Sequence, residues 1–437
     1  MKIPYKSVLI YTLAVLLNTV YLKAEEKPST LILKNADYNT NSLKNDQWIS
    51  YLQGNVTFEY KNGTISADQA TWYRSEGIIL FQHNINVTTD STQFSCQRID
   101  YFRAEKKIIA NVNIDFFDPK EQIRIIAQNA EYKLETKQLS LTINPKIFHY
   151  DTAHSDTSTI SANIITYDDS LKIATATNDV RFLNPKEQIN IFAQNAEYLV
   201  EKKYLTLTKN PKMVHYDTAR SETLTIVSEK MIYNDSLKTA TLLNDVIMKQ
   251  GAWKSICKNA RYNTETGIAK LRNDPWIYYN IDELTGDSVD LFFKERSLRG
   301  VSVMRNVRGF QRDTSKTDTI FREMTGDSIY MSFSDSSYLD KIWVWGNAKT
   351  LYYSSKNPEN INEAFGKVME LDFARGEINT LNIKDNAEFF YFMDNKKDTG
   401  RIESSGDKIK IKFNNGDAIY MTITGAVRGT YFSKRTQ

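Results

Sequence analysis

Residues 65–73 read ISADQATWY, and this stretch comes back as IIAQNAEY at 125–132, IFAQNAEY at 191–198 and ICKNARY at 256–262. Each copy holds a large anchor residue near its end. The anchors stand about 29–35 residues apart at first and about 40 apart in the last three copies, a regular spacing that predicts a stack of about twelve similar units. They are Tyr38, Trp72, Tyr101, Tyr132, Tyr167, Tyr198, Tyr233, Tyr262, Leu291, Met331, Leu371 and Ile411.

Positions counted back from the anchor follow two alternating patterns. Position −7 is usually large and aliphatic, position −5 is small in every copy but the first, and position −2 is always apolar. Alternate residues of a strand face opposite sides, so positions −7 and −5 share one side and position −2 shares the other side with the anchor. A period-2 pattern that slips by one predicts a bulge or bend. We therefore expect a strand that turns a corner at the small residue.

Cys96 and Cys257 both occupy position −5. Two cysteines cannot form a disulfide framework or a four-cysteine metal site. Their shared position favours small buried hydrophobic residues over a disulfide.

A second strand is expected after each anchor. A turn rich in Asp, Ser, Lys, Gly and Asn comes first, such as DDSLK at 168–172, and apolar residues follow at positions +7 and +9. A block like GNVTF at 54–58 often comes next. Each unit then contributes two bent strands, so the chain is expected to be all-β, with about 24 short strands. Because that is too many for one flat open sheet, they should pack as two facing sheets.

Composition and a duplication narrow the class of protein. The 437 residues carry 56 Lys and Arg against 53 Asp and Glu, which argues against a nucleic-acid partner. Residues 116–181 and 182–247 align without a gap, with about 40 identical pairs, so they arose by internal duplication. We expect repeats of 29–35 residues over 25–277 and longer repeats over 278–437.

The first 24 residues are typical of an export signal. Lys2 and Lys6 precede the mostly apolar run from Val8 to Leu22, and Ala24 offers a cleavage point. A retained inner-membrane anchor is the alternative. Either way, we expect the rest of the chain in the periplasm.

The repeated motif, followed by a turn and a Gly-Asn-Val block, resembles the OstA-like (organic solvent tolerance) family of lipopolysaccharide-transport proteins. The resemblance implies an elongated open β-jellyroll whose facing sheets shelter the acyl chains of lipid A. It also implies partners, an inner-membrane adaptor and an outer-membrane translocon, and edge-to-edge association. Residues 31–38 and 418–432 are the expected edge strands.

The lumen is the candidate binding site. We favour positions −7, +7 and +9 as its lining, with the small position −5 beside them, because these positions are the most consistently aliphatic. The candidates are Ile65, Ala67, Ile79, Phe81, Ile108, Ile125, Ala127, Leu139, Leu141, Ile160, Ile191, Leu205, Leu207, Ile226 and Leu271.

We expect no enzyme activity, cofactor or metal. His149 and His215 each precede an aspartate by two residues, but no third ligand is evident in the sequence. Two other functions stay open: an extracellular structural β-solenoid adhesin without a lipid ligand, and a polysaccharide-active β-helix enzyme.

Overall fold

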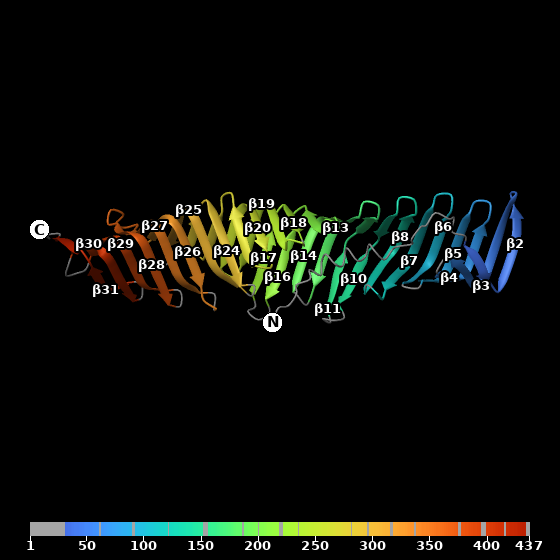
Figure 1. Cartoon of the computed structure of the whole chain (residues 1–437), viewed down its shortest axis with the longest axis horizontal. Coiled ribbons are helices and arrows are strands. Elements are labelled where there is room, and N and C mark those ends of the chain that lie inside the picture. The colour runs from blue at the N-terminus through green and yellow to red at the C-terminus, as the bar shows by residue number, and fades with distance from the viewer. Residues whose placement is uncertain are drawn as a thin grey trace. The chain divides into compact units, whose positions relative to one another are not determined.

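The computed structural model describes residues 31–433, apart from 61–62, 90–91, 121, 152–155, 186–187, 200, 218–221, 235, 281, 295–296, 315–317, 336–337, 375–376, 395–398 and 415–416. The expected export signal lies outside these residues. Within them the regular structure consists of 32 β-strands, which confirms the all-β prediction (Figure 1). The described part of the chain has no helix long and apolar enough to cross a membrane.

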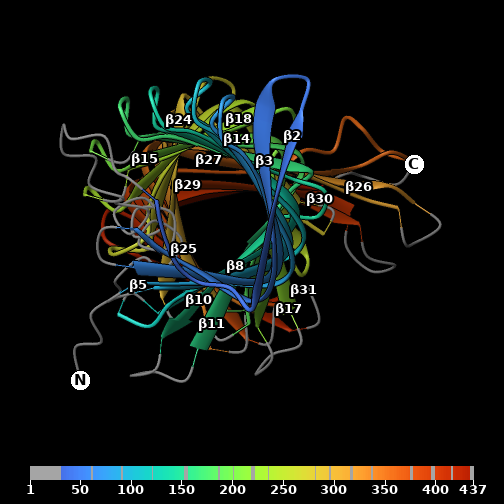
Figure 2. The same cartoon turned by 90° about the vertical axis from the view of Figure 1, so that its right-hand side faces the viewer.

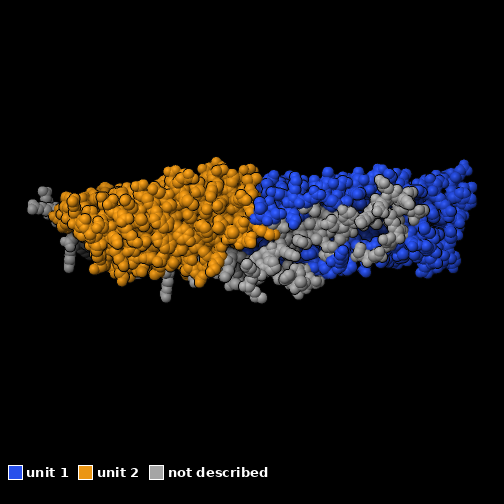
Figure 3. All heavy atoms as spheres, in the orientation of Figure 1, with its two compact units in different colours: residues 1–216, 230–237 blue, residues 217–229, 238–437 orange. Residues whose placement is uncertain are grey.

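The chain divides into two compact units (Figure 3). Unit 1 is residues 1–216 with 230–237, and unit 2 is residues 217–229 with 238–437. The strands of unit 1 are β1 (Ile32–Asn35), β2 (Tyr38–Lys44), β3 (Gln47–Tyr60), β4 (Gly63–Tyr73), β5 (Ile78–Thr89), β6 (Gln93–Phe102), β7 (Lys107–Asp118), β8 (Ile123–Lys133), β9 (Gln138–Thr142), β10 (Lys146–Asp151), β11 (Asp156–Ser161), β12 (Ile164–Asp168), β13 (Ile173–Asn184), β14 (Ile189–Leu199), β15 (Tyr204–Thr208), β16 (Lys212–Asp217) and β18 (Lys230–Asn234). Those of unit 2 are β17 (Glu222–Val227), β19 (Thr239–Gln250), β20 (Trp253–Asn263), β21 (Ile268–Arg272), β22 (Trp276–Tyr279), β23 (Asp282–Thr285), β24 (Ser288–Lys294), β25 (Ser297–Asp313), β26 (Ile320–Phe333), β27 (Leu339–Ser354), β28 (Asn362–Ala374), β29 (Glu377–Asp394), β30 (Thr399–Asn414), β31 (Asp417–Thr424) and β32 (Arg428–Ser433).

Unit 1 consists of two antiparallel sheets that share their longer strands. The anchor sheet, named for the anchor residues in it, runs β2–β3–β4–β5–β6–β7–β8–β9–β12–β13–β14–β15–β18. The opposite sheet runs β1–β3–β4–β5–β6–β7–β8–β10–β11–β13–β14–β16. In the end view of Figure 2, β15 and β18 lie in the upper part, whereas β10 and β11 lie at the bottom. Each long strand is therefore an arm that passes from one sheet to the other.

Each arm passes from one sheet to the other at a corner, and the backbone conformation of this corner repeats along the chain. In β3, Gly54 and Asn55 stand opposite the single residue Asp68 of β4, so the register shifts there. Both residues have left-handed φ, 68° and 46°. Apart from Asn45/Asp46 in the turn between β2 and β3, two consecutive left-handed residues occur at twelve corners of the described chain: Gly54/Asn55, His83/Asn84, Val112/Asn113, Ile143/Asn144, Asn178/Asp179, Lys209/Asn210, Asn244/Asp245, Asn273/Asp274, Arg305/Asn306, Gly346/Asn347, Asp385/Asn386 and Gly425/Ala426.

The corner explains the strand count. Eight arms are divided at the corner into two strands each, so the 32 described strands form 24 arms, the number that the repeat predicts. The corner also explains the slip in the pattern, which falls on the arm opposite the bulge. In β4 the exposed Asp68 and Gln69 are consecutive, so the residues on either side of them, Ala67 and Ala70, are both buried.

Polar side chains tie neighbouring corners together on the outer side. The Nδ2 of Asn55 donates to Oδ2 of Asp37 at 3.0 Å, and the Nδ2 of Asn84 donates to Oδ2 of Asp68 at 2.8 Å. In unit 2 the Nδ2 of Asn306 donates to Oδ1 of Asp287 at 2.9 Å. Asparagine suits this place because it tolerates the left-handed region and its amide reaches the preceding arm.

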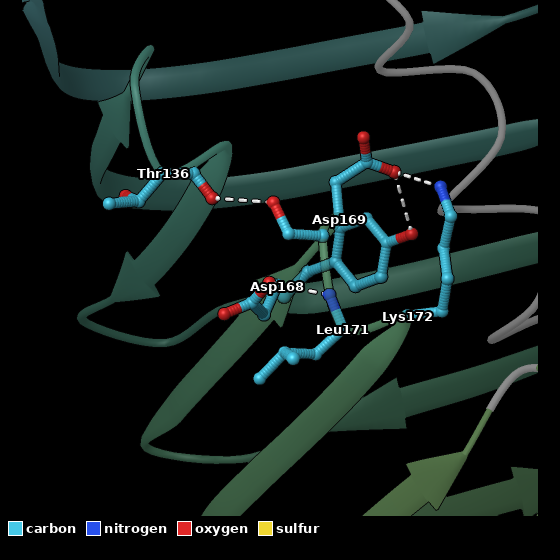
Figure 4. Close-up of polar contacts among 7 residues, drawn as sticks. Thr136, Asp168, Asp169, Leu171 and Lys172 are labelled. Atoms are coloured by element: carbon cyan, nitrogen blue, oxygen red, sulfur yellow. Dashed lines mark hydrogen bonds and ion pairs between the residues drawn. The ribbon is translucent and has the colours of Figure 1, made fainter.

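The turns at the far edge of the anchor sheet are tied to each other as well (Figure 4). The Oγ of Ser170 donates to the carbonyl oxygen of Thr136, in the preceding turn, at 3.3 Å. Within its own turn, the Leu171 amide donates to Oδ1 of Asp168 at 2.9 Å, and Lys172 pairs with Asp169. These contacts account for the turn block DDSLK.

Cys96 and Cys257 are free and buried, as position −5 predicts. They pair in register with Ile85 and Val246 of the neighbouring arms. Burial raises the pKa of the Cys96 thiol to about 12 and that of Cys257 to about 11. Both therefore behave as small hydrophobic residues.

Candidate functional site

The interior between the two sheets holds most of the predicted lining. Thirteen of the fifteen candidates lie in unit 1, and Ile226 and Leu271 lie in unit 2. Four are partly exposed: Ile65, Ile108, Leu139 and Ile191. Eleven are buried: Ala67, Ile79, Phe81, Ile125, Ala127, Leu141, Ile160, Leu205, Leu207, Ile226 and Leu271.

One small cavity of unit 1 shows how the two sheets share the interior. It measures about 40 Å³ and brings together four candidates: Ile160, Ile191, Leu205 and Leu207. Its other lining residues are Ile165, Ala174, Thr175, Ala176, Val180, Phe182, Ala193, Ala196 and Tyr198. Ile160, Val180 and Phe182 belong to the opposite sheet, whereas Ala174, Leu205 and Leu207 belong to the anchor sheet.

Nine of the thirteen lining residues were not among the candidates. Sequence reasoning favoured positions −7, +7 and +9, yet the cavity also takes Ala196 at position −2 and the anchor Tyr198 itself. Both sets face inward because β14 bends at Gln194, opposite the two left-handed residues of β13, and the alternation reverses at this bend. The signal was present in the pair of polar residues, Gln194 and Asn195, that separates the two inward runs.

Around this cavity the interior is filled by its own side chains. A cavity of about 40 Å³ is close to the volume of one water molecule, so a larger guest needs the two sheets to move apart. The corner edge is where continuous arms join the sheets. Separation of the two sheets is therefore a hinge motion about the corner.

The inner surface becomes polar at the far edge of the opposite sheet. Asp118, Asn184 and Gln250 occupy equivalent places 66 residues apart and are only 2–3% exposed. The Nδ2 of Asn184 donates to Oγ of the buried Ser158 at 3.2 Å. In unit 2 the Nε2 of Gln311 donates to Asp282, whose pKa is raised by burial. The inner surface is thus apolar at the corner and polar at this edge.

The histidines lie at this polar edge. His149 pairs in register with Ile123 and Ser158, and His215 pairs with Ile189. The side chains of Asp151 and Asp217, the expected second members of the pairs, lie outside the described residues. Among the described residues no group of three His, Cys, Asp or Glu could hold a metal ion.

Strand edges with exposed apolar side chains occur at both predicted places. In the described pairings β1 and β2 each contact β3, and β31 and β32 each contact β30. Large hydrophobic residues on these strands are 50–71% exposed: Ile32, Tyr38, Leu43, Ile419, Tyr420, Tyr431 and Phe432.

Bent antiparallel arms that line an apolar interior define a β-jellyroll built from repeats. Residues 35–173 match the model of the family described as LptA/(LptD N-terminal domain) LPS transport protein. The match confirms the resemblance to a lipopolysaccharide-transport family that the repeated motif predicts. It covers about a third of the chain.

Among solved structures, the chain is similar to LptH of Pseudomonas aeruginosa, described as the LptA-homologous periplasmic component of the lipopolysaccharide transport device. The identity is 9% and the TM-score 0.18, over 34% of this chain and 82% of that one. No curated protein matches the sequence.

Proposed function

We propose that this chain is a periplasmic lipopolysaccharide-transport protein that shelters acyl chains of lipid A between its two sheets. The observation that carries the proposal is the inward-facing apolar lining from both sheets, within a segment of the transport family. Burial of an acyl chain of about twelve methylene groups contributes about 10 kcal/mol, at about 0.8 kcal/mol per group. Part of that offsets the contacts between the sheets that opening breaks.

The polar edge of the opposite sheet supports one orientation of the bound lipid. Acyl chains would lie toward the corner, and the sugar and phosphate groups would leave past the polar side chains such as Asn184 and Gln250. Because burial is not directional, net movement has to be driven by partners.

Photo-crosslinking tests the sheltering role. A crosslinking amino acid at Ile191 faces the interior, and the same probe at its neighbour Phe192 faces outward on the same strand, β14. We expect lipopolysaccharide adducts from Ile191, and likewise from Ile125 and Leu139, but not from Phe192 or from Lys172 in a turn. Equal yields at Ile191 and Phe192, or none at either, would contradict the proposal.

The bridging role is part of the proposal, and the exposed edges support it. Unpaired strand edges are templates for pairing with another chain. Probes at Tyr38 of β2 and Tyr420 of β31 should crosslink to a second copy or to membrane components of the transport machinery, identified by mass spectrometry. A probe at Lys172 is the control. Adducts that are equally frequent at Lys172 would argue against edge-to-edge assembly.

Export and the absence of catalysis remain predictions. N-terminal sequencing of the periplasmic protein should find Glu25 first if the signal is cleaved after Ala24. Detection of the intact N-terminus in the inner membrane would favour the retained anchor instead.

A further inference from the structure

The outer surface of unit 1 carries a hollow of about 650 Å³ that the lipid path does not use. It lies on the opposite sheet, across β5, β6, β7, β8 and β10. Its lining includes Thr88 and Gln93 on one side and Phe117, Arg124 and Tyr150 on the other.

The register of the strands explains why this surface is hollowed. Thr88, Gln93, Phe117 and Arg124 follow one another across four strands, paired in register. The two rings of Phe117 and Tyr150 and the Arg124 side chain therefore lie on neighbouring strands beside the smaller Thr88 and Ser95. Tyr150 is held at the rim by the hydrogen bond of its amide to the carbonyl oxygen of Gln122, at 2.9 Å.

Arg124 is fixed and its charge is compensated. Its Nε donates to Oδ1 of Asp115 at 2.8 Å and its Nη2 donates to Oδ2 at 2.5 Å. The two side chains are 47% and 33% exposed, so a ligand can reach both. Among the described lining residues, Arg124 and Asp115 are the charged ones. The hollow thus offers fixed donors and acceptors without net charge.

This combination suits one ligand chemistry. The half-buried rings of Phe117 and Tyr150 provide apolar faces for the C–H side of a sugar ring. The guanidinium, the carboxylate and the amides of Gln93 and Gln122 can exchange hydrogen bonds with its hydroxyls. A phosphate would meet the carboxylate of Asp115, and an acyl chain would leave the polar groups unpaired. We propose that this hollow binds a neutral oligosaccharide.

The internal duplication provides a natural comparison. The places of Asp115, Phe117 and Arg124 are taken, 66 residues later, by Arg181, Leu183 and Asn190. Gln188 and Tyr216 repeat Gln122 and Tyr150. The second copy has therefore kept the equivalents of Gln122 and Tyr150. It has lost the aromatic ring of Phe117 and the ion pair of Asp115 with Arg124. The fold accepts leucine and asparagine at these two places.

A binding titration of the full chain tests the proposal. The probes are two neutral saccharides, maltotriose and a neutral oligosaccharide from the outer part of lipopolysaccharide, and inorganic phosphate. We expect saturable saccharide binding that changes little between low and high salt, because the site has no net charge. The double variant Phe117→Leu/Arg124→Asn carries residues that the second copy uses, and it should bind at least about tenfold more weakly.

The matched control is Leu183→Ala/Asn190→Ala, which should bind saccharide like the unmodified chain. Binding of the neutral lipopolysaccharide oligosaccharide alone would identify the sugar part of lipopolysaccharide as the source, and binding of maltotriose as well would identify a broader neutral glycan. Phosphate binding in place of sugar binding, or saccharide binding unchanged by the double variant, would overturn the proposal. The crosslinks from Ile191 should persist in the double variant, so failure here is distinct from failure of the lipid path.

Discussion

The corners of unit 1 and of unit 2 are packed with different residues at the same two positions. In unit 1 position −5 holds Ala67, Cys96, Ala127, Ala162 and Ala193, whereas unit 2 ends with Gly286, Gly326, Gly366 and Gly406. The residue two positions before the bulge on the next arm changes with it. It is Phe81, Ala110, Leu141, Ala176 and Leu207 in unit 1, but Val303, Val344, Ile383 and Ile423 beside the glycines.

The contacts explain this pairing. A Cβ added to Gly326 would lie 2.5 Å from Cγ1 of Val344, and one added to Gly366 would lie 2.5 Å from Cγ2 of Ile383. A β-branched residue therefore occupies the space that the alanine methyl fills elsewhere. Side chains without a branch at Cβ leave that space free. The residues at the two positions change together because their side chains fill one shared space, while the backbone conformation of the corner stays the same.

The first and largest predicted effect concerns this pair. Gly326→Ala should destabilise unit 2 by about 2–3 kcal/mol, because the added methyl overpacks against Val344. Adding Val344→Ala should recover part of the loss, although Val344→Ala alone costs stability. Urea unfolding gives the free energies, and hydrogen exchange should localise the change to β26 and β27. Additive effects in the double variant would contradict the shared volume.

The second prediction compares the side-chain packing in the interiors of the two units. Val303→Ala should cost about 2 kcal/mol, because Val303 is fully buried in a filled interior. Ala176→Val should also cost stability in unit 1, by about 1–2 kcal/mol, because the branched side chain would overpack against the methyl group of Ala162 at position −5. Thermal unfolding of both variants checks this. A gain of stability in Ala176→Val would mean that the cavity of about 40 Å³ takes up the two added methyl groups.

The third prediction concerns the first left-handed residue of the bulge. Unit 2 has Gly346 there, with φ 70°, whereas unit 1 has Val112, with φ 63°. A β-branched residue in this region is strained, so Val112→Gly should stabilise unit 1 by about 0.5–1 kcal/mol net of the entropy of glycine. Gly346→Ala should have the opposite sign. If Val112→Gly is destabilising, contacts of the valine outweigh its strain.

The last prediction substitutes no residue and compares the local stability of the two units by cysteine labelling. Cys96 reports on unit 1 and Cys257 on unit 2, and both thiols have raised pKa values, about 12 and about 11, through burial. At pH 8 each should be alkylated roughly 100-fold or more slowly than a free thiol, at a rate set by local opening. Peptide mass spectrometry separates the two rates. Rapid labelling of one cysteine would identify the less stable unit.

Much of the fold could be predicted because the chain repeats itself. Twelve anchors, the small position −5 and the polar turns gave 24 arms and their bend without any long-range information. The slip in the alternation indicated a corner, since a bulge or bend reconciles two inward runs in one strand. The motif also indicated the family that residues 35–173 match.

The lining was predicted only in part. Alternation suggests that one parity faces inward, so Ala196 and Tyr198 were assigned to the other side. Their inward position follows from the bend of β14 opposite the two left-handed residues of β13. The hollow beside Arg124 gave no sequence signal, because its members come from five strands that are adjacent only in the folded sheet.

The sequence by itself determined the repeat, the all-β class, the corner and the turns, because these depend on residues close together in the chain. The tertiary structure alone decided which side chains share a volume. The pairing of Gly326 with Val344 and the meeting of Phe117, Arg124 and Tyr150 both depend on register between arms. Register is set by the packing of whole sheets, and no local stretch of sequence specifies it.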